Sequence, residues 1–141
     1  MAFVFNMGAV KMPLHNENGV EIGVATYNPK DFGILTRAKN SEHYLDKLVK
    51  IFEGYTKHDQ TDDEALKVME KACNTLEEYC DTVFGKGFYA GAFEKINPFT
   101  ELESGEWFAV EVINAVLGDI RDRVKARTVL EEKYLKGYKN A

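Results

Sequence analysis

The feature that most constrains the fold is a long amphipathic helix with a defined start. Thr61-Asp62-Asp63-Glu64 matches a capping box, in which the Thr and Glu side chains satisfy each other's backbone N–H groups in the first turn. Apolar side chains then recur at spacings of three and four, at Leu66, Met69, Cys73, Leu76, Cys80 and Val83. Gly85 stands where a helix C-terminus takes glycine. The pattern predicts a helix from Thr61 to Phe84 with one face in a core and the other in water.

Helices are also expected before this one. Asn28-Pro29 offers an N-cap followed by proline at the first helical position, so a helix should begin at about Pro29 and break near Asn40-Ser41. A second run, from Ser41 to Glu53, should end at Gly54. Its apolar face consists of Tyr44, Leu45, Leu48, Ile51 and Phe52.

Two further helices are predicted after Gly85. A short one should run from Phe88 to about Lys95, before Asn97-Pro98 breaks it. A last long helix should begin near Ser104. Its apolar positions hold helical spacing at Trp107, Phe108, Val110, Ile113, Val116, Leu117, Ile120 and Val124.

The start of the chain favours β-structure. Two β-compatible runs, 9–14 and 19–27, flank a loop whose Asn18-Gly19 end supplies the positive φ that a hairpin needs. A chain of 141 residues makes about one domain. We therefore predict a mainly α fold as a single domain, 1–141. It comprises a short N-terminal β-hairpin region, 1–27, and a helical region, 28–141, of about four to five helices packed as one bundle.

Net charge and composition limit the kinds of partner and the location that the sequence favours. The formal charge of −5 argues against non-specific nucleic-acid binding. The chain shows no secretory leader, no apolar run of membrane length and no cysteine framework, so we expect a cytoplasmic protein that does not bind membranes. Residues 61–82 carry seven acids against two lysines, whereas residues 120–141 carry seven bases against three acids. This charge dipole predicts a homo-oligomer with head-to-tail contacts that weaken with salt.

No pattern indicates catalysis. In Gly85-Lys86-Gly87 the lysine is followed by glycine rather than Ser or Thr, and the loop follows a helix, so a helix cap is favoured over a phosphate-binding loop. The three histidines, His15, His43 and His58, lack metal-ligand spacing, and Cys73 and Cys80 fall on the apolar stripe. The acids of 62–81 mostly lie off that stripe. We expect a protein that is not an enzyme and takes no metal or cofactor.

An aromatic cluster is the candidate site. It consists of Phe84, Phe88, Tyr89, Phe93, Trp107 and Phe108, with Phe99 nearby. Two interpretations stand. The rings pack between the two long helices as core, which is favoured, or they line a groove that binds an amphipathic partner helix. If the rings line a groove, aspartate at Phe88 or Phe93 would abolish partner binding without unfolding the protein. If the rings are core, the same substitutions would unfold it.

The order of these parts resembles a known family. The acidic helix ends in Asp81-Thr82-Val83-Phe84-Gly85-Lys86-Gly87, an aromatic segment with Ala90-Gly91-Ala92-Phe93 follows, and the closing helix is rich in Lys and Tyr. This resembles the tail assembly chaperones of long-tailed phages and prophages of Gram-positive bacteria, over roughly residues 20–140. The resemblance implies a small, mainly helical, non-enzymatic protein that binds the tape measure protein and keeps it soluble during tail assembly.

Two parts of the chain depart from that pattern. Residues 97–102 are richer in helix breakers than the family's pattern leads us to expect, and residues 1–7 match no pattern. The alternative function is a structural tail protein or another phage accessory protein without enzymatic activity. The two differ in whether the protein remains in the purified virion.

Overall fold

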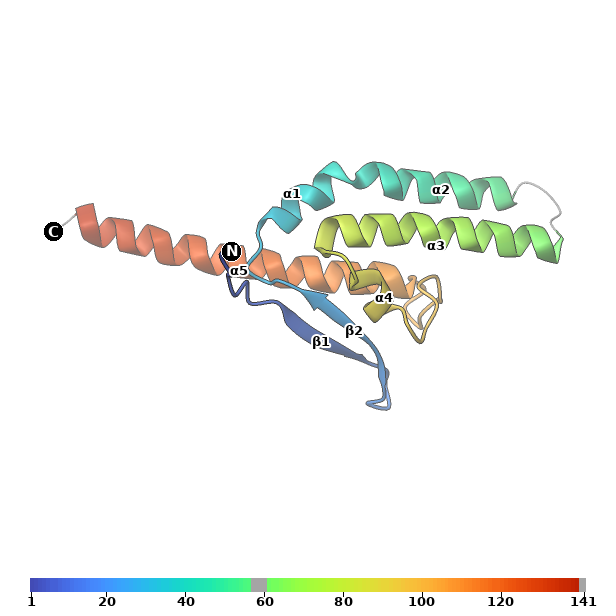
Figure 1. The fold of residues 1–141 in the computed structure, drawn as a ribbon, viewed down its shortest axis with the longest axis horizontal. Helices are drawn as coiled ribbons and strands as arrows, with labels where there is room; N and C mark the ends of the chain where they lie inside the picture. The colour runs from blue at the N-terminus through green and yellow to red at the C-terminus, as the bar shows by residue number, and fades with distance from the viewer. Residues whose placement is uncertain (57–60, 140–141) are drawn as a thin grey trace.

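The computed structural model of the chain describes residues 1–56 and 61–139. A β-hairpin precedes five helices in the described residues (Figure 1). The mainly helical fold with an N-terminal hairpin is thus confirmed. The elements are β1 (Val10–His15), β2 (Glu21–Tyr27), α1 (Gly33–Asn40), α2 (Glu42–Thr56), α3 (Asp62–Phe84), α4 (Phe88–Ala92) and α5 (Phe108–Lys139).

The hairpin forms where the sequence predicts it. β1 and β2 pair antiparallel, with Val10 opposite Tyr27 and Leu14 opposite Gly23. The loop is closed by Asn16, whose Oδ1 accepts hydrogen bonds from the backbone N–H groups of Asn18 and Val20. Gly19 has φ +75°, the conformation that glycine adopts at little cost.

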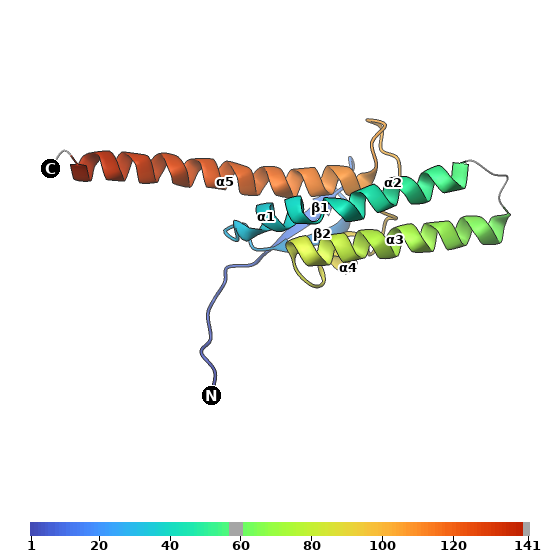
Figure 2. The ribbon, with the colours of Figure 1, turned by 90° about the horizontal axis from the view of Figure 1, so that it is seen from above.

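Both predicted ends of the long helix are confirmed. The Thr61 hydroxyl accepts a hydrogen bond from the Glu64 N–H at 3.2 Å, and α3 ends at Phe84. Gly85 follows with φ +120° and ψ +152°, a region that is essentially restricted to glycine. The predicted stripe is buried in the second half of α3. Leu66 in the first half is 69% exposed, because α2 and α3 extend as a pair beyond the other elements (Figure 2).

Two predicted boundaries on the N-terminal side are wrong. α1 begins at Gly33 instead of Pro29, because Asn28 and Asp31 form side-chain-closed turns: Asn28 Oδ1 accepts from the Lys30 N–H, and Asp31 Oδ1 from the Gly33 N–H. Gly54 does not stop α2, which continues to Thr56. A glycine inside a helix costs only about 1 kcal/mol, and the packing of α2 on α3 outweighs it. The break at Asn40-Ser41 is confirmed.

The ends of the last two helices also differ from the expectation. α4 stops at Ala92, short of Lys95. α5 begins at Phe108, four residues after Ser104, because backbone bonds close a small loop first. In this loop the Leu102 N–H donates to the Glu106 carbonyl at 2.8 Å, and the Phe108 N–H donates to the Thr100 carbonyl at 2.8 Å.

A close approach of two backbones joins the hairpin to the helices. A Cβ on Gly91 of α4 would lie 2.7 Å from the carbonyl oxygen of Val24, and one on Gly23 would clash with the carbonyl of Ala92. Only glycine at both positions lets α4 lie on β2 at this distance. The Gly in Ala90-Gly91-Ala92 is therefore a packing requirement.

The helices pack as a bundle only in part. α2 and α3 form an antiparallel pair, α4 lies on β2, and α5 runs beside α1 and then extends beyond the rest of the molecule (Figure 1). One hydrophobic cluster draws buried side chains from β2 and all five helices. The assignment of 1–141 to a single domain remains a prediction. No helix in the described part of the chain is both long and apolar enough to cross a membrane.

Candidate partner-binding groove

The six aromatic residues that the sequence singles out do not form one surface. Phe84, Phe88, Phe93 and Phe108 are buried, and Phe88 is only 1% exposed. Tyr89 and Trp107 are half-buried. The burial favours the core interpretation for the four phenylalanines. Whether any of the six contacts a partner remains a prediction.

The rings divide into separate groups. Phe84 stacks on Phe88 with centroids 4.4 Å apart, and Phe93 meets Phe108 edge-on at 5.6 Å. Trp107 lies elsewhere, against Phe52 at 5.0 Å and Phe99 at 5.1 Å. Phe99 thus holds the breaker-rich segment before α5 against α2. The sequence placed Trp107 in the same cluster as Phe88 only because the two are close along the chain.

The structure instead places an apolar groove between α1–α2 and α5, which we call the α1–α5 groove. Its volume is about 420 Å³, and its lining combines buried or half-buried apolar side chains with exposed polar and charged ones, which we call its rim. The apolar residues are Leu35, Ala38, Leu45, Tyr79, Ile113 and Leu117, and the rim residues are Lys39, Glu42, Asn114 and Arg121. Both signs of charge stand at the rim, so the groove matches the apolar stripe and mixed flanks of an amphipathic helix.

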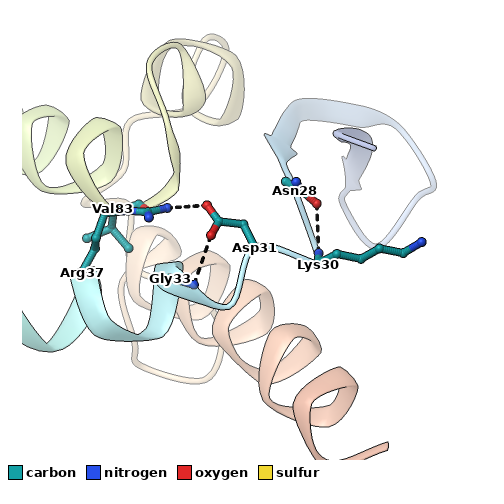
Figure 3. A network of polar contacts seen from close by, with 6 residues as sticks. All are labelled: Asn28, Lys30, Asp31, Gly33, Arg37 and Val83. Atoms are coloured by element: carbon teal, nitrogen blue, oxygen red, sulfur yellow. Dashed lines mark hydrogen bonds and ion pairs between the residues drawn. The ribbon is translucent and has the colours of Figure 1, made fainter. Parts of the chain in front are cut away.

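An ion pair holds the α1 wall of the groove in place (Figure 3). The Arg37 guanidinium contacts Asp31 Oδ2 at 2.7 Å, and its Nε–H donates to the Val83 carbonyl at 3.1 Å. This carbonyl is one of the last in α3, where a helix leaves acceptors without intrahelical partners and favours positive charge. Arg37 therefore ties α1 to the end of α3.

A tyrosine forms part of the groove's apolar lining. Tyr79 of α3 is buried, and this burial raises the pKa of its hydroxyl to about 12, with the negative charge of Glu42 adding to the effect and the positive charge of Arg121 opposing it. The hydroxyl therefore stays protonated at neutral pH. It cannot act as a base at that pH.

The α5 wall is anchored to the hairpin. The Tyr27 hydroxyl donates to Asp119 Oδ2 at 2.8 Å, and Arg123 contacts the same carboxylate at 3.2 Å. Burial of Tyr27, together with this hydrogen bond and the negative charge of Asp119, raises its pKa to about 12. β2 and α5 are thus joined by a hydrogen bond to a charged acceptor.

The other candidate groups do not come together as a reactive site. Cys80 is buried, and burial raises the pKa of its thiol, so it remains protonated. Cys73 is half-buried on the same helix. His15 and His43 are exposed, whereas His58 lies outside the described residues. Within residues 1–56 and 61–139, no three His, Cys, Asp or Glu side chains gather as metal ligands would.

The chain matches no protein-family model, no curated protein and no solved structure.

Sequence reasoning missed the α1–α5 groove although it placed three of the residues that line it on predicted apolar faces. Leu45 was predicted on the apolar face of its helix, and Ile113 and Leu117 on that of α5. The periodicity says that these side chains face other helices. It does not say that four helices meet with space between them, which depends on the angle at Ser41 and on the loop before Phe108.

Proposed function

We propose that this protein is a non-enzymatic assembly chaperone that binds an amphipathic helix of the tape measure protein during assembly of a phage tail. It would act in the cytoplasm of the bacterial host and keep that long helical chain from self-association. The observation that carries the proposal is the α1–α5 groove, with its apolar lining and mixed rim. The resemblance of residues 81–93 to tail assembly chaperones is the reason for choosing the tape measure protein as the partner.

The groove suits such a partner better than the buried phenylalanines do. A tape measure protein has repeated apolar helical faces, and a helix binds a groove through side chains spaced at i, i+3, i+4 and i+7. Leu35 and Leu45 line the groove and are half-buried, so a bound helix can contact them without displacing a core side chain. Charges of both signs at the rim favour one orientation of the bound helix and contribute less to its affinity.

Co-expression with the tape measure protein followed by affinity purification tests this function. The wild-type chain should retain the partner. Asn114→Arg should reduce the retained amount at least about tenfold, because a long charged side chain on the rim takes the place of the bound helix.

The neighbouring residue provides a matched control. Ala115 is exposed on the same helix but lines a different groove, so Ala115→Arg should retain the partner at the wild-type level. Failure of the wild-type chain to bind would remove the chaperone function. Binding that both substitutions leave unchanged would keep the function and remove the groove.

The alternative, a structural tail protein, calls for a different observation. A chaperone leaves when the tail is complete, whereas a structural component stays. Mass spectrometry of purified virions should find the major tail proteins and not this chain. Its presence at a fixed ratio to the tail tube subunits would favour the structural alternative.

A further inference from the structure

The first nine residues form an uncovered apolar arm. The arm leads away from the body instead of folding back along β1 (Figure 2). Its large side chains are exposed, with Phe3 at 93% and Phe5 at 75%. Exposed apolar side chains in a continuous segment are typical of an interaction site.

The arm has the pattern of a β-strand with one apolar face. Met1, Phe3, Phe5 and Met7 occupy alternate positions, which lie on the same side of an extended chain. The intervening residues Ala2 and Asn6 are small or polar, and only Val4 departs from the alternation. The segment 1–9 contains no charged side chain and no proline. Such a segment is suited to strand addition.

The same chain carries an acceptor for such a strand. Within the described residues the sheet has two strands, so β1 pairs with β2 alone and its other edge is open. Beside β1 lies a second groove of about 410 Å³, the β1–α5 groove, with a mainly apolar lining that includes Leu14, Ile22, Leu102, Val112 and Ala115. Pro13 lacks an N–H, so this edge offers an incomplete hydrogen-bond ladder and apolar contacts in the groove must supply part of the affinity.

We propose that residues 1–9 bind a second copy of this chain, by adding to the open edge of its β1 and placing Phe3 and Phe5 in its β1–α5 groove. Two copies exchange arms about a two-fold axis, so each donates one arm and accepts one. This inference does not depend on the tape measure protein, because it involves a different groove from the one assigned to that partner.

The size of the contact is what a stable dimer needs. A buried aromatic side chain removes about 150–250 Å² from water, so the four phenylalanine rings of two exchanged arms account for about 600–1,000 Å². The methionines and the acceptor surface add to this. Because the acceptor surface loses an area comparable to that of the rings, the total is about 1,200–2,000 Å², the range that specific stable interfaces bury.

Sedimentation velocity over a concentration series tests the proposal. The wild-type chain should be a dimer at micromolar concentration. Phe3→Asp/Phe5→Asp should raise the dissociation constant at least about 100-fold, since each substitution places a charge in an apolar groove. The control Ala2→Asp/Asn6→Asp adds the same charge to the other side of the arm and should dimerise like the wild type.

Variants of the acceptor identify the groove. Ala115→Arg fills the β1–α5 groove from an exposed helix position and should give a monomer. Asn114→Arg, which alters the α1–α5 groove, should remain a dimer. Mixing the Phe3→Asp/Phe5→Asp chain with the Ala115→Arg chain should restore a heterodimer, because one intact arm meets one intact groove.

Three results would overturn the proposal. The first is a wild-type chain that stays monomeric at all concentrations, as it would if the arm bound its own β1. The second is dimerisation that the arm and groove variants leave intact. The third is association that 0.5 M salt abolishes, because contacts between acidic and basic ends are screened by salt on the order of 0.1 M and above whereas apolar contacts are not.

Discussion

Residues 84–93 and residues 1–9 are both rich in aromatic side chains, yet the fold treats them in opposite ways. Phe84, Phe88 and Phe93 are buried, whereas Phe3 and Phe5 stand in solvent. The first segment lies between α3 and β2 and has partners on several sides. The second precedes β1, leads away from the rest of the molecule and has no pairing partner in the described structure (Figure 2). The density of rings in a sequence thus does not distinguish a core from a binding site.

The difference arises from what surrounds each segment. α4 is too short to be stable alone and exists because Gly23 and Gly91 let it lie directly on β2. The arm has no helix opposite it.

The largest effect is expected from a charge in the buried segment. Phe88→Asp removes a fully buried ring, which costs about 3–5 kcal/mol, and adds the cost of burying a carboxylate. The sum approaches the total stability of about 5–15 kcal/mol that domains have, so the variant should be unfolded by circular dichroism. The control Phe5→Asp should melt like the wild type at concentrations where the wild type is monomeric. A folded Phe88→Asp protein would return Phe88 to the list of candidate binding residues.

The next largest effect concerns the contact of α4 with β2. In Gly91→Ala the new methyl group would overlap the Val24 carbonyl, and we expect a loss of about 3 kcal/mol, at the upper end for overpacking. Urea unfolding measures the loss. Gly54→Ala serves as the control, because a Cβ there meets no atom within 4 Å and should stabilise α2 by up to about 1 kcal/mol. Equal stability of Gly91→Ala and the wild type would contradict the close approach.

A smaller effect should follow substitution of the glycine that ends α3. Gly85→Val forces a β-branched residue into φ +120°, which should cost about 1–2 kcal/mol. Thermal melting of this variant is compared with that of Lys86→Ala. Lys86 is exposed, so its substitution should shift stability by less than about 0.5 kcal/mol. Identical melting temperatures for Gly85→Val and the wild type would refute the role of Gly85 as a cap.

The smallest effect is expected where the arm leaves the hairpin. Tyr27 pairs opposite Val10 and ties the hairpin to α5 through Asp119. Tyr27→Phe should cost about 0.5–1.5 kcal/mol at neutral pH, as loss of a typical hydrogen bond does, because the part-exposed Asp119 keeps its contact with Arg123. Asp119→Asn keeps a polar acceptor and should cost less. A Tyr27→Phe chain as stable as the wild type would mean that α5 is held by apolar contacts alone.

The same tyrosine sets an alkaline limit on stability. Its pKa is raised from 10.0 in the unfolded chain to about 12 in the folded protein, so the folded state holds the proton more tightly. The stabilisation is complete below pH 10 and is lost as the pH rises toward 12. Tyr79 behaves in the same way. Urea midpoints between pH 9 and 12 should fall less steeply for Tyr27→Phe than for the wild type.

The sequence by itself determined the parts whose causes are local. The Thr61 cap, the end of α3 at Gly85, the hairpin and the break at Asn40-Ser41 each depend on a few neighbouring residues, and each is confirmed. Two predicted helix boundaries were wrong because other interactions outweighed the local signal. Side-chain turns at Asn28 and Asp31 make α1 begin later than Pro29, and the packing of α2 on α3 lets α2 continue past Gly54.

Tertiary structure alone decided which apolar residues are covered. Leu45 and Leu117 are far apart in sequence and line one groove, whereas Phe88 and Trp107, which are closer, lie apart. Phe5 and Phe88 are the same type of residue, but only Phe88 has helices and a strand packed around it. Burial is a property of what surrounds a residue, and those surroundings come from distant parts of the chain that helical or strand periodicity cannot locate.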